Sequence, residues 1–376
     1  MSSRTAAQDL GTNADLSRGR PLSGAARRPG FDVLRGLAIG LVLLRHTWDQ
    51  VFSGGGIVGV VLFFTLSGYL ITGVIDRDIR QNGRLSFARF YAHRAFRLLP
   101  ALVLMLVVFA VVESVFNVLG DRPIIAQTIG AALFYIRDFP LPFSTSPAIN
   151  TLWTLAVEEQ FYLVWPILLV VALRWKSVNK LLVGAFVLLT VLCFVSAIIF
   201  AKDPATVYIL PTTWASAIVL GAVAYVHREA ISDFITKTAL RRWVGSGIAI
   251  VGFLGLSLLP GAKNTLWVYL VGGPLVAVLT IVLIAVVGRW EVLPTYILEP
   301  LRRLGIVSYA VYIWNALILD WFRSTTFLPR WTEIVATILV AIISWYTVEA
   351  LGRRGRARFD ARSRSPRRAQ VAESAE

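Results

Sequence analysis

Residues 31–50 read FDVLRGLAIGLVLLRHTWDQ, an apolar stretch of membrane-spanning length that also contains Arg35, Arg45, His46 and Asp49. Charged groups are costly inside a bilayer and usually face the interior of a helical bundle or a water-filled cavity. Arg35 and His46 are eleven residues apart. In a helix this spacing places them on nearly the same face, about 16 Å apart along the axis. The stretch therefore predicts a membrane helix with one polar side turned inward.

The rest of the chain is similarly apolar. Of its 376 residues, 56% are hydrophobic and 16% are charged, and the mean hydropathy is +0.68. The short alternating strands typical of a membrane β-barrel are absent from the sequence. We therefore predict an all-α, polytopic membrane protein with ten transmembrane helices. The predicted spans are 32–50, 57–75, 99–118, 156–173, 181–200, 208–226, 243–260, 265–287, 304–322 and 331–350.

The distribution of basic residues predicts how these helices are oriented. With both termini in the cytoplasm, the predicted cytoplasmic segments contain 29 of the 37 Lys and Arg residues, and the external segments contain six. This bias is the one expected for cytoplasmic loops. A further apolar segment, 124–136, is short for a span, and we interpret it as re-entrant or interfacial. If it crossed the membrane, the split would become 16 inside and 19 outside.

This topology predicts three parts. Residues 1–30 form a disordered cytoplasmic segment, 31–351 form the transmembrane domain, and 352–376 form a disordered, basic cytoplasmic tail that lies on anionic lipid. The net charge of +15 therefore reflects orientation and the tail, and nucleic acid is not predicted as a partner. The only cysteine, Cys193, lies in an apolar run, which excludes an intramolecular disulfide and a thiolate metal cluster.

His46 is the candidate catalytic residue. It is the only histidine in a predicted span, because His93 and His227 fall in predicted cytoplasmic loops. Imidazole is the side chain best suited to move a proton near neutral pH. The alternative interpretation is a hydrogen-bonded structural histidine, with Arg35 extending to the membrane surface.

The stretch FARFYAHRAFRLLP, residues 87–100, contains two arginines one helical turn apart. Arg94 and Arg97 precede Pro100, which we predict opens the third span. Two guanidinium groups at the start of a helix can bind phosphate. Anchoring of the helix at the cytoplasmic surface would require the same residues.

Two further stretches carry polar residues or glycines in apolar surroundings. In NTLWTLAVEEQFYLVWP, residues 150–166, Glu158 and Tyr162 share a helical face, and Glu159 follows Glu158. A solvated interfacial pair of carboxylates is the alternative to a functional one. In GIVGVVLFFTLSGYLIT, residues 56–72, the glycines and Ser67 allow close packing of helices.

Together these stretches resemble the acyltransferase-3 family of membrane O-acyltransferases, which includes bacterial O-antigen, peptidoglycan and antibiotic acylases. The resemblance covers about residues 31–350. It rests on five ordered motifs, LRGLAIGLVLLRH, FFTLSGYLI, HRAFRLLP, LWTLAVEEQFYLVWP and SYAVYIW, the last at residues 308–314.

The resemblance implies transfer of an acyl group, acetyl above all, from acyl-coenzyme A to a hydroxyl of a sugar or glycosylated metabolite. It places the protein in the bacterial cytoplasmic membrane, without a metal, and leaves oligomerisation open. It implies His46 and Glu158 as catalytic residues, with His46 acting as a general base or, in a second route, forming an acyl-histidine. Arg35, Arg94 and Arg97 would bind the donor. The supporting or substrate-binding residues would be Ser67, Trp153, Glu159, Tyr162, Tyr309 and Asn315.

Three features depart from the family pattern. Val61 replaces a frequent Asp, Asn315 replaces a frequent His after the SYAVYIW motif, and no extracellular esterase domain follows the last predicted span. The last feature predicts a single-domain enzyme. The competing functional class is a transporter or flippase for a small amphipathic or glycolipid substrate, since this class also places charge inside a helical bundle.

Overall fold

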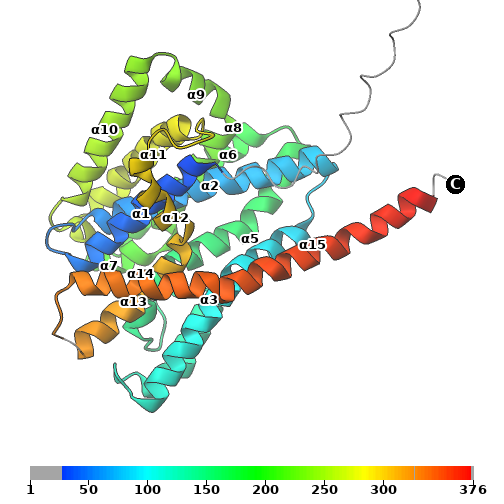
Figure 1. Ribbon diagram of the computed structural model, residues 1–376. Helices are drawn as coiled ribbons and strands as arrows, with labels where there is room; N and C mark the ends of the chain where they lie inside the picture. Colours follow the sequence, from blue (N-terminus) through cyan, green and yellow to red (C-terminus); the bar gives the residue numbers. More distant parts are fainter. Residues whose placement is uncertain (1–27, 326, 374–376) are drawn as a thin grey trace, which may run out of the picture.

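The computed structural model describes residues 28–325 and 327–373, with side chains described as far as residue 361 (Figure 1). Within these residues the fold is entirely helical, with no strand, which confirms the predicted class. The predicted N-terminal segment 1–30 lies almost wholly outside the described residues.

Each predicted span overlaps a helix of the structure. These helices are α1 (Pro29–Thr47), α2 (Gly55–Asn82), α3 (Phe87–Val115), α5 (Trp153–Arg174), α6 (Val178–Ile199), α8 (Pro211–Val226), α10 (Ala239–Ser257), α11 (Gly273–Val287), α13 (Ser308–Thr325) and α14 (Trp331–Tyr346). Shorter elements connect them. These are η1 (Arg122–Ile124), α4 (Ile125–Leu133), η2 (Pro147–Leu152), α7 (Pro204–Ile209), α9 (Arg228–Thr236), η3 (Ala262–Asn264), the π-helical turn η4 (Val268–Gly272), η5 (Tyr296–Leu298) and α12 (Glu299–Ile306), and α15 (Val348–Glu373) completes the chain.

The described helices are those of a multi-pass membrane protein. By length and composition, eight helices can cross a membrane, or nine if the pair Tyr296–Ile306 and Ser308–Thr325, bent by 66°, forms one span. Helix α1 is the remaining predicted span. It is not among these helices because it contains three charged residues, Asp32, Arg35 and Arg45. The count of ten and the orientation of the termini stay predictions.

Glycines bring the central helices into direct backbone contact. A Cβ added to Gly68 of α2 would lie 1.8 Å from the carbonyl oxygen of Ile218 in α8. Helices α1 and α12 are equally close, since a Cβ added to Gly36 of α1 would lie 1.9 Å from the carbonyl oxygen of Leu301 in α12. No larger residue fits at these two positions without separating the helices. The predicted role of glycine in the 56–72 stretch is confirmed at Gly68.

The helices divide into central and peripheral ones. Most of the apolar part of α2 is buried, whereas α6 and α10 expose nearly all of theirs. Val187 of α6 and Leu240 of α10, for example, are exposed. A helix with an apolar outer face is expected at the lipid boundary of a bundle.

Helix α3 begins earlier than predicted. Pro100 lies inside the helix, which starts at Phe87, so Pro100 does not begin the helix, and the start of the membrane span at this position stays a prediction. Proline has no amide hydrogen, which leaves the carbonyl of Phe96, one turn earlier, without its helical donor. Gly352 of α15 packs closely against this carbonyl. The early start places Arg94 and Arg97 on the helix.

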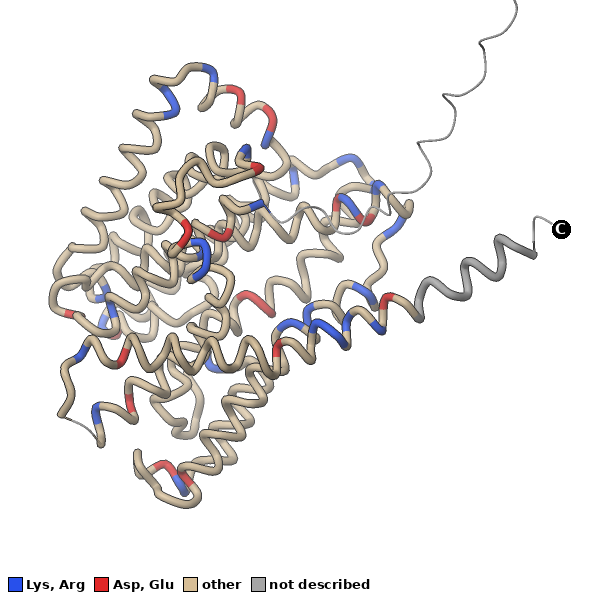
Figure 2. The backbone as a smooth tube through the Cα atoms, viewed as in Figure 1, with Lys and Arg blue, Asp and Glu red and all other residues tan. Residues whose placement is uncertain are grey.

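The segment predicted to be disordered from residue 352 continues as helix α15. It lies along α3 and extends beyond the bundle (Figure 1). The Nε2 atom of His93 lies 2.7 Å from Oδ1 of Asp360, and the ring of Phe359 contacts Phe96. The first turns of α15 are rich in arginine, as Figure 2 shows. These contacts explain why residues 352–361 are ordered against α3.

The ambiguous segment 124–136 contains a helix of nine residues, α4. This helix is too short to cross a bilayer. Its Thr128 is buried and accepts a hydrogen bond from the backbone amide of Ser146 at 3.0 Å. The structure therefore agrees with a non-crossing segment.

Candidate active site

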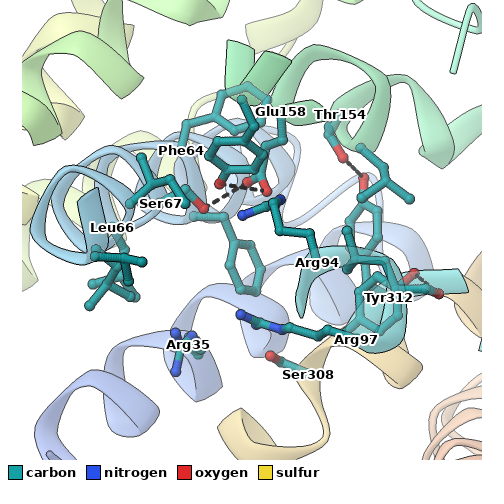
Figure 3. Close-up of a pocket in the computed structure, with 18 of the residues that line it drawn as sticks. Arg35, Phe64, Leu66, Ser67, Arg94, Arg97, Thr154, Glu158, Ser308 and Tyr312 are labelled. Carbon is teal, nitrogen blue, oxygen red and sulfur yellow. Dashed lines mark hydrogen bonds between the residues drawn. The ribbon is translucent and has the colours of Figure 1, made fainter. Parts of the chain in front are cut away.

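A cavity of about 250 Å³ lies among α1, α2, α3, α5 and α13 (Figure 3). Seven of the residues predicted for the site line it: Arg35, Ser67, Arg94, Arg97, Glu158, Tyr162 and Tyr309. Five different helices supply them, so the site exists only in the assembled bundle. Four predicted residues do not line it, namely His46, Trp153, Glu159 and Asn315.

Glu158 forms the acidic side of the cavity. The Ser67 hydroxyl of α2 donates a hydrogen bond to Oε1 of Glu158 at 3.0 Å, and the Tyr162 hydroxyl donates to Oε2 at 3.2 Å. Each carboxylate oxygen thus has a neutral donor, which stabilises its negative charge. The Tyr162 contact confirms that Glu158 and Tyr162 share one face of α5.

Arg94 is bound to α5. Its Nη2 atom lies 2.7 Å from Oε1 of Glu159, and its guanidinium carbon lies 3.4 Å from the centre of the Tyr162 ring. An ion pair and a cation–π contact together fix the side chain in one orientation. Figure 3 shows Arg94 directed toward Glu158 and Ser67. Glu159 therefore acts on the cavity indirectly, through Arg94.

Arg97 and Arg356 make the cavity strongly cationic. Neither has an ion pair with an acidic residue in the described part of the chain. Figure 3 shows Arg97 beside Ser308 and directed toward Arg35. Arg35 is itself paired with Asp32, at 2.9 Å. The cavity therefore presents unneutralised guanidinium groups, which are suited to phosphate.

Tyrosines form the wall contributed by α13. Tyr309 donates a hydrogen bond to the carbonyl oxygen of Leu98 in α3 at 2.7 Å. Tyr312 accepts from the Thr154 hydroxyl at 2.6 Å and donates to the carbonyl oxygen of Thr151 at 2.7 Å. These bonds tie α13 to α3 and to the start of α5.

Sequence reasoning missed five polar residues of the cavity: His93, Thr154, Ser308, Tyr312 and Arg356. His93 lies in HRAFRLLP, directly before Arg94. Thr154 lies within the quoted stretch 150–166, and Ser308 and Tyr312 lie within SYAVYIW, so their motifs contained a signal. Arg356 lies in the segment predicted to be disordered, and no pattern there distinguishes it from its basic neighbours.

His46 lies at the other end of α1, outside the cavity. Its Nδ1 atom forms a hydrogen bond with Oδ1 of Asn315, and Asn315 is fully buried in α13. An amide oxygen can only accept, so Nδ1 carries the hydrogen and Nε2 keeps its lone pair. The Arg323 side chain donates to the backbone carbonyl of His46 at 2.7 Å. Asn315, a departure from the family pattern, is thus the residue that fixes the imidazole.

Trp153 belongs to a buried aromatic cluster. Its ring lies 5.0 Å from that of Tyr208 and 6.3 Å from that of Trp214, measured between ring centres. It therefore supports the packing between the cavity and the His46 end of α1. Among the residues described, no group of three His, Cys, Asp or Glu side chains could bind a metal ion.

The fold and the site define a multi-pass helical membrane protein with a cationic cavity and a tautomer-fixed histidine on one helix. The chain belongs to the acyltransferase-3 family, since the model of that acyltransferase domain matches residues 28–349. The resemblance predicted from the motifs is confirmed.

Two bacterial relatives show where the similarity lies. The chain is 30% identical over 353 residues to the peptidoglycan O-acetyltransferase OatA of Listeria monocytogenes, which covers 85% of this chain and 55% of OatA. It is also 30% identical over 352 residues to the Bacillus subtilis protein YrhL, provisionally named a peptidoglycan O-acetyltransferase, covering 85% of this chain and 54% of YrhL. The chain thus spans about half the length of these relatives. No solved structure matches it.

Proposed function

We propose that the protein is an O-acyltransferase of the bacterial cytoplasmic membrane that moves an acyl group, acetyl above all, from acyl-coenzyme A to a carbohydrate hydroxyl. A glycosylated metabolite is included among the acceptors. The observation that carries this proposal is the placement of a cationic cavity and the His46–Asn315 pair at the two ends of α1. The names of the relatives support a carbohydrate acceptor.

The cavity is the donor site in this proposal. Arg97 and Arg356, assisted by Arg35, bind the phosphate groups of coenzyme A, because guanidinium groups pair with phosphate oxygens through two parallel hydrogen bonds. The predicted topology, with ten spans and both termini inside, puts this cavity on the cytoplasmic side, where it meets soluble acyl-coenzyme A. Arg94 contributes charge while remaining bound to Glu159.

The reaction takes place at the His46 end of α1. The Nε2 atom of His46 removes the proton from the acceptor hydroxyl, and the oxygen attacks the thioester carbonyl carbon. The carbon–sulfur bond breaks, and the coenzyme A thiolate recovers the proton from the imidazolium. Asn315 keeps Nε2 available through its bond to Nδ1. An acyl-histidine intermediate is the second route and uses the same nitrogen as nucleophile.

Glu158 receives a different role from the catalytic one that the resemblance implies. It lies in the cavity beside Ser67 and Tyr162, whereas His46 lies outside the cavity. We assign it to the polar wall that positions the acylated arm of the donor.

The test is consumption of the donor by the purified full chain. Radiolabelled acetyl-coenzyme A is incubated with soluble glycans, and label in the glycan and free thiol are measured together. Transfer with equal release of thiol is expected. Movement of a glycolipid across vesicles without loss of thioester would replace the proposal with the transporter alternative.

A further inference from the structure

A second set of cations surrounds the His46 end of α1, away from the donor cavity. This outer cation cluster consists of Arg45, Lys263, Arg323 and Arg330. Three of its members, Lys263, Arg45 and Arg323, lie near enough to act electrostatically on His46. The proposed mechanism gives the four residues of this outer cation cluster no part in donor binding.

Two members of the cluster have acidic partners. Arg323 pairs with Glu333 of α14 at 3.2 Å and also donates to the carbonyl oxygen of His46. Arg330 pairs with Asp49 at 3.6 Å. Their charges are therefore neutralised, and their contacts fix the end of α1 against α13 and α14.

The other two members are not neutralised. Neither Arg45 nor Lys263 forms an ion pair with an acidic residue in the described part of the chain. The Nε atom of Arg45 is buried without a hydrogen-bond partner. The Lys263 ammonium lies over the ring of Tyr208, 4.4 Å from its centre. Two neighbouring cations without an anion repel each other, and a bound anion would offset this cost.

Lys263 remains mostly charged at neutral pH. It lies in the connection between α10 and α11, and burial, with the charge of Arg45, lowers its pKa to about 8. The negative charge of Asp49 raises the pKa of Lys263 and so partly offsets this lowering. The other groups near Lys263 are the imidazole of His46 and the hydroxyls of Tyr208 and Tyr269. The Tyr269 hydroxyl donates to the carbonyl oxygen of Lys263.

We propose that Arg45 and Lys263 bind a negatively charged group of the carbohydrate acceptor beside His46. The substrate class is therefore an anionic glycan, with a carboxylate or a phosphate near the acylated hydroxyl. The cluster reaches the protein surface through Arg323 and Arg330, which keep 45% and 57% of their side-chain area exposed, whereas Arg45 and Lys263 lie deeper and are partly exposed. The identification of the anion with the acceptor rests on the proposed function, whereas the anion site itself does not.

The experiment measures equilibrium binding of three sugars to the purified full chain. N-acetylglucosamine is the neutral probe, N-acetylmuramic acid adds a carboxylate, and N-acetylglucosamine 1-phosphate adds a phosphate. All three keep the hydroxyl at C6. The variants are Arg45→Gln, Lys263→Gln and the charge-keeping Lys263→Arg. The matched control is Lys202→Gln, which changes an exposed lysine outside the cluster.

At least one anionic sugar should bind about 10-fold tighter than the neutral one, as expected for one charge-assisted hydrogen bond. Lys263→Gln and Arg45→Gln should remove this preference, while Lys263→Arg and Lys202→Gln retain it. Comparison of the two anionic probes shows whether carboxylate or phosphate is the natural group. Unchanged binding of acetyl-coenzyme A shows that each variant is folded.

Equal binding of neutral and anionic sugars, or no binding of any, would overturn the inference. So would a preference that survives both Gln variants. A clear preference in a protein that never consumes acetyl-coenzyme A would leave the anion site standing and refute the acyltransferase proposal.

Discussion

The two ends of α1 carry similar charges in different surroundings. At one end, Arg35 and Arg97 border a cavity that six helices line, since α15 contributes Arg356. At the other end, His46 and Arg45 lie among cations that are partly exposed. A concave cavity lined by several elements suits a small molecule. In the proposed function this difference corresponds to donor binding in the cavity and acceptor binding at the His46 end of α1.

The largest effect expected is all-or-none and concerns orientation. The comparison assigns the ends of α1 to opposite sides of the membrane, with loops 76–98 and 227–242 cytoplasmic and 138–152 external. In a Cys193→Ser background, an impermeant thiol reagent applied to whole cells should label Ser144→Cys and not Lys237→Cys. Labelling of Lys237→Cys from outside would reverse the assignment of the two ends.

The second effect separates the chemistry at His46 from donor binding. His46→Gln keeps much of the size and polarity of the side chain but removes the base, so transfer should fall by about 10²–10⁴-fold. Binding of acetyl-coenzyme A, measured by calorimetry, should be unchanged because His46 lies outside the cavity. His46→Ala should behave in the same way. Transfer at near wild-type rate by the Gln variant would exclude His46 from the mechanism.

The third effect compares the two arginines of α3. Arg97→Lys should weaken donor binding by about 1–3 kcal/mol, because lysine keeps the charge but loses the paired contact to phosphate. Arg94→Lys should weaken it less and should lower the melting temperature, because Arg94 already binds Glu159 and the Tyr162 ring. Calorimetry and thermal unfolding measure the two quantities. Equal donor binding by wild type and both Lys variants would make these residues anchors only.

The fourth effect tests the fixed imidazole. Asn315→Ala removes the acceptor for Nδ1, and a net loss of about 1 kcal/mol corresponds to a roughly fivefold lower rate of transfer. Asn315→His restores the residue frequent in the family and should keep most of the activity. Initial rates at saturating donor measure both variants. A faster Ala variant than His variant would contradict a positioning role for Asn315.

The smallest effect is a pH dependence confined to the acceptor end. Lysine loses its proton as the pH rises through its pKa, which for Lys263 is about 8. The ratio of binding constants for anionic and neutral sugars should therefore fall severalfold between pH 7 and pH 9. Lys263→Arg should abolish this fall, since arginine stays charged. The same fall in the Arg variant would place the titrating group elsewhere.

The sequence predicted the helices well because each is a long apolar run with basic residues at the predicted inner end. It was less informative where the structure depends on distant partners. In the sequence, Pro100 is typical of a helix start. In the structure the helix continues through Pro100, and Gly352 packs against the Phe96 carbonyl that this proline leaves without a donor. The tail reads as disordered because its composition is basic, and its order depends on His93 and Phe96 of α3.

The motifs identified most of the cavity residues, but they did not indicate that His46 lies apart from the cavity. Arg35, Glu158 and Arg97 were predicted to serve one site with His46, and they line a cavity that His46 does not border. The bond between His46 and Asn315 joins residues 269 positions apart. A single sequence holds no local pattern for such a pairing, since it arises only when α1 packs against α13.

The contact between α15 and α3 has a consequence for how the protein is made. A ribosome produces the cavity residues of α1, α2, α3 and α5 long before it reaches Arg356, which contributes to the same wall. The cavity is therefore incomplete while most of the bundle is already being inserted into the membrane. Because α15 can pack across α3 only after α14 has been synthesised, the cavity gains Arg356, and with it the full set of its cations, only after the other helices that line it have been made.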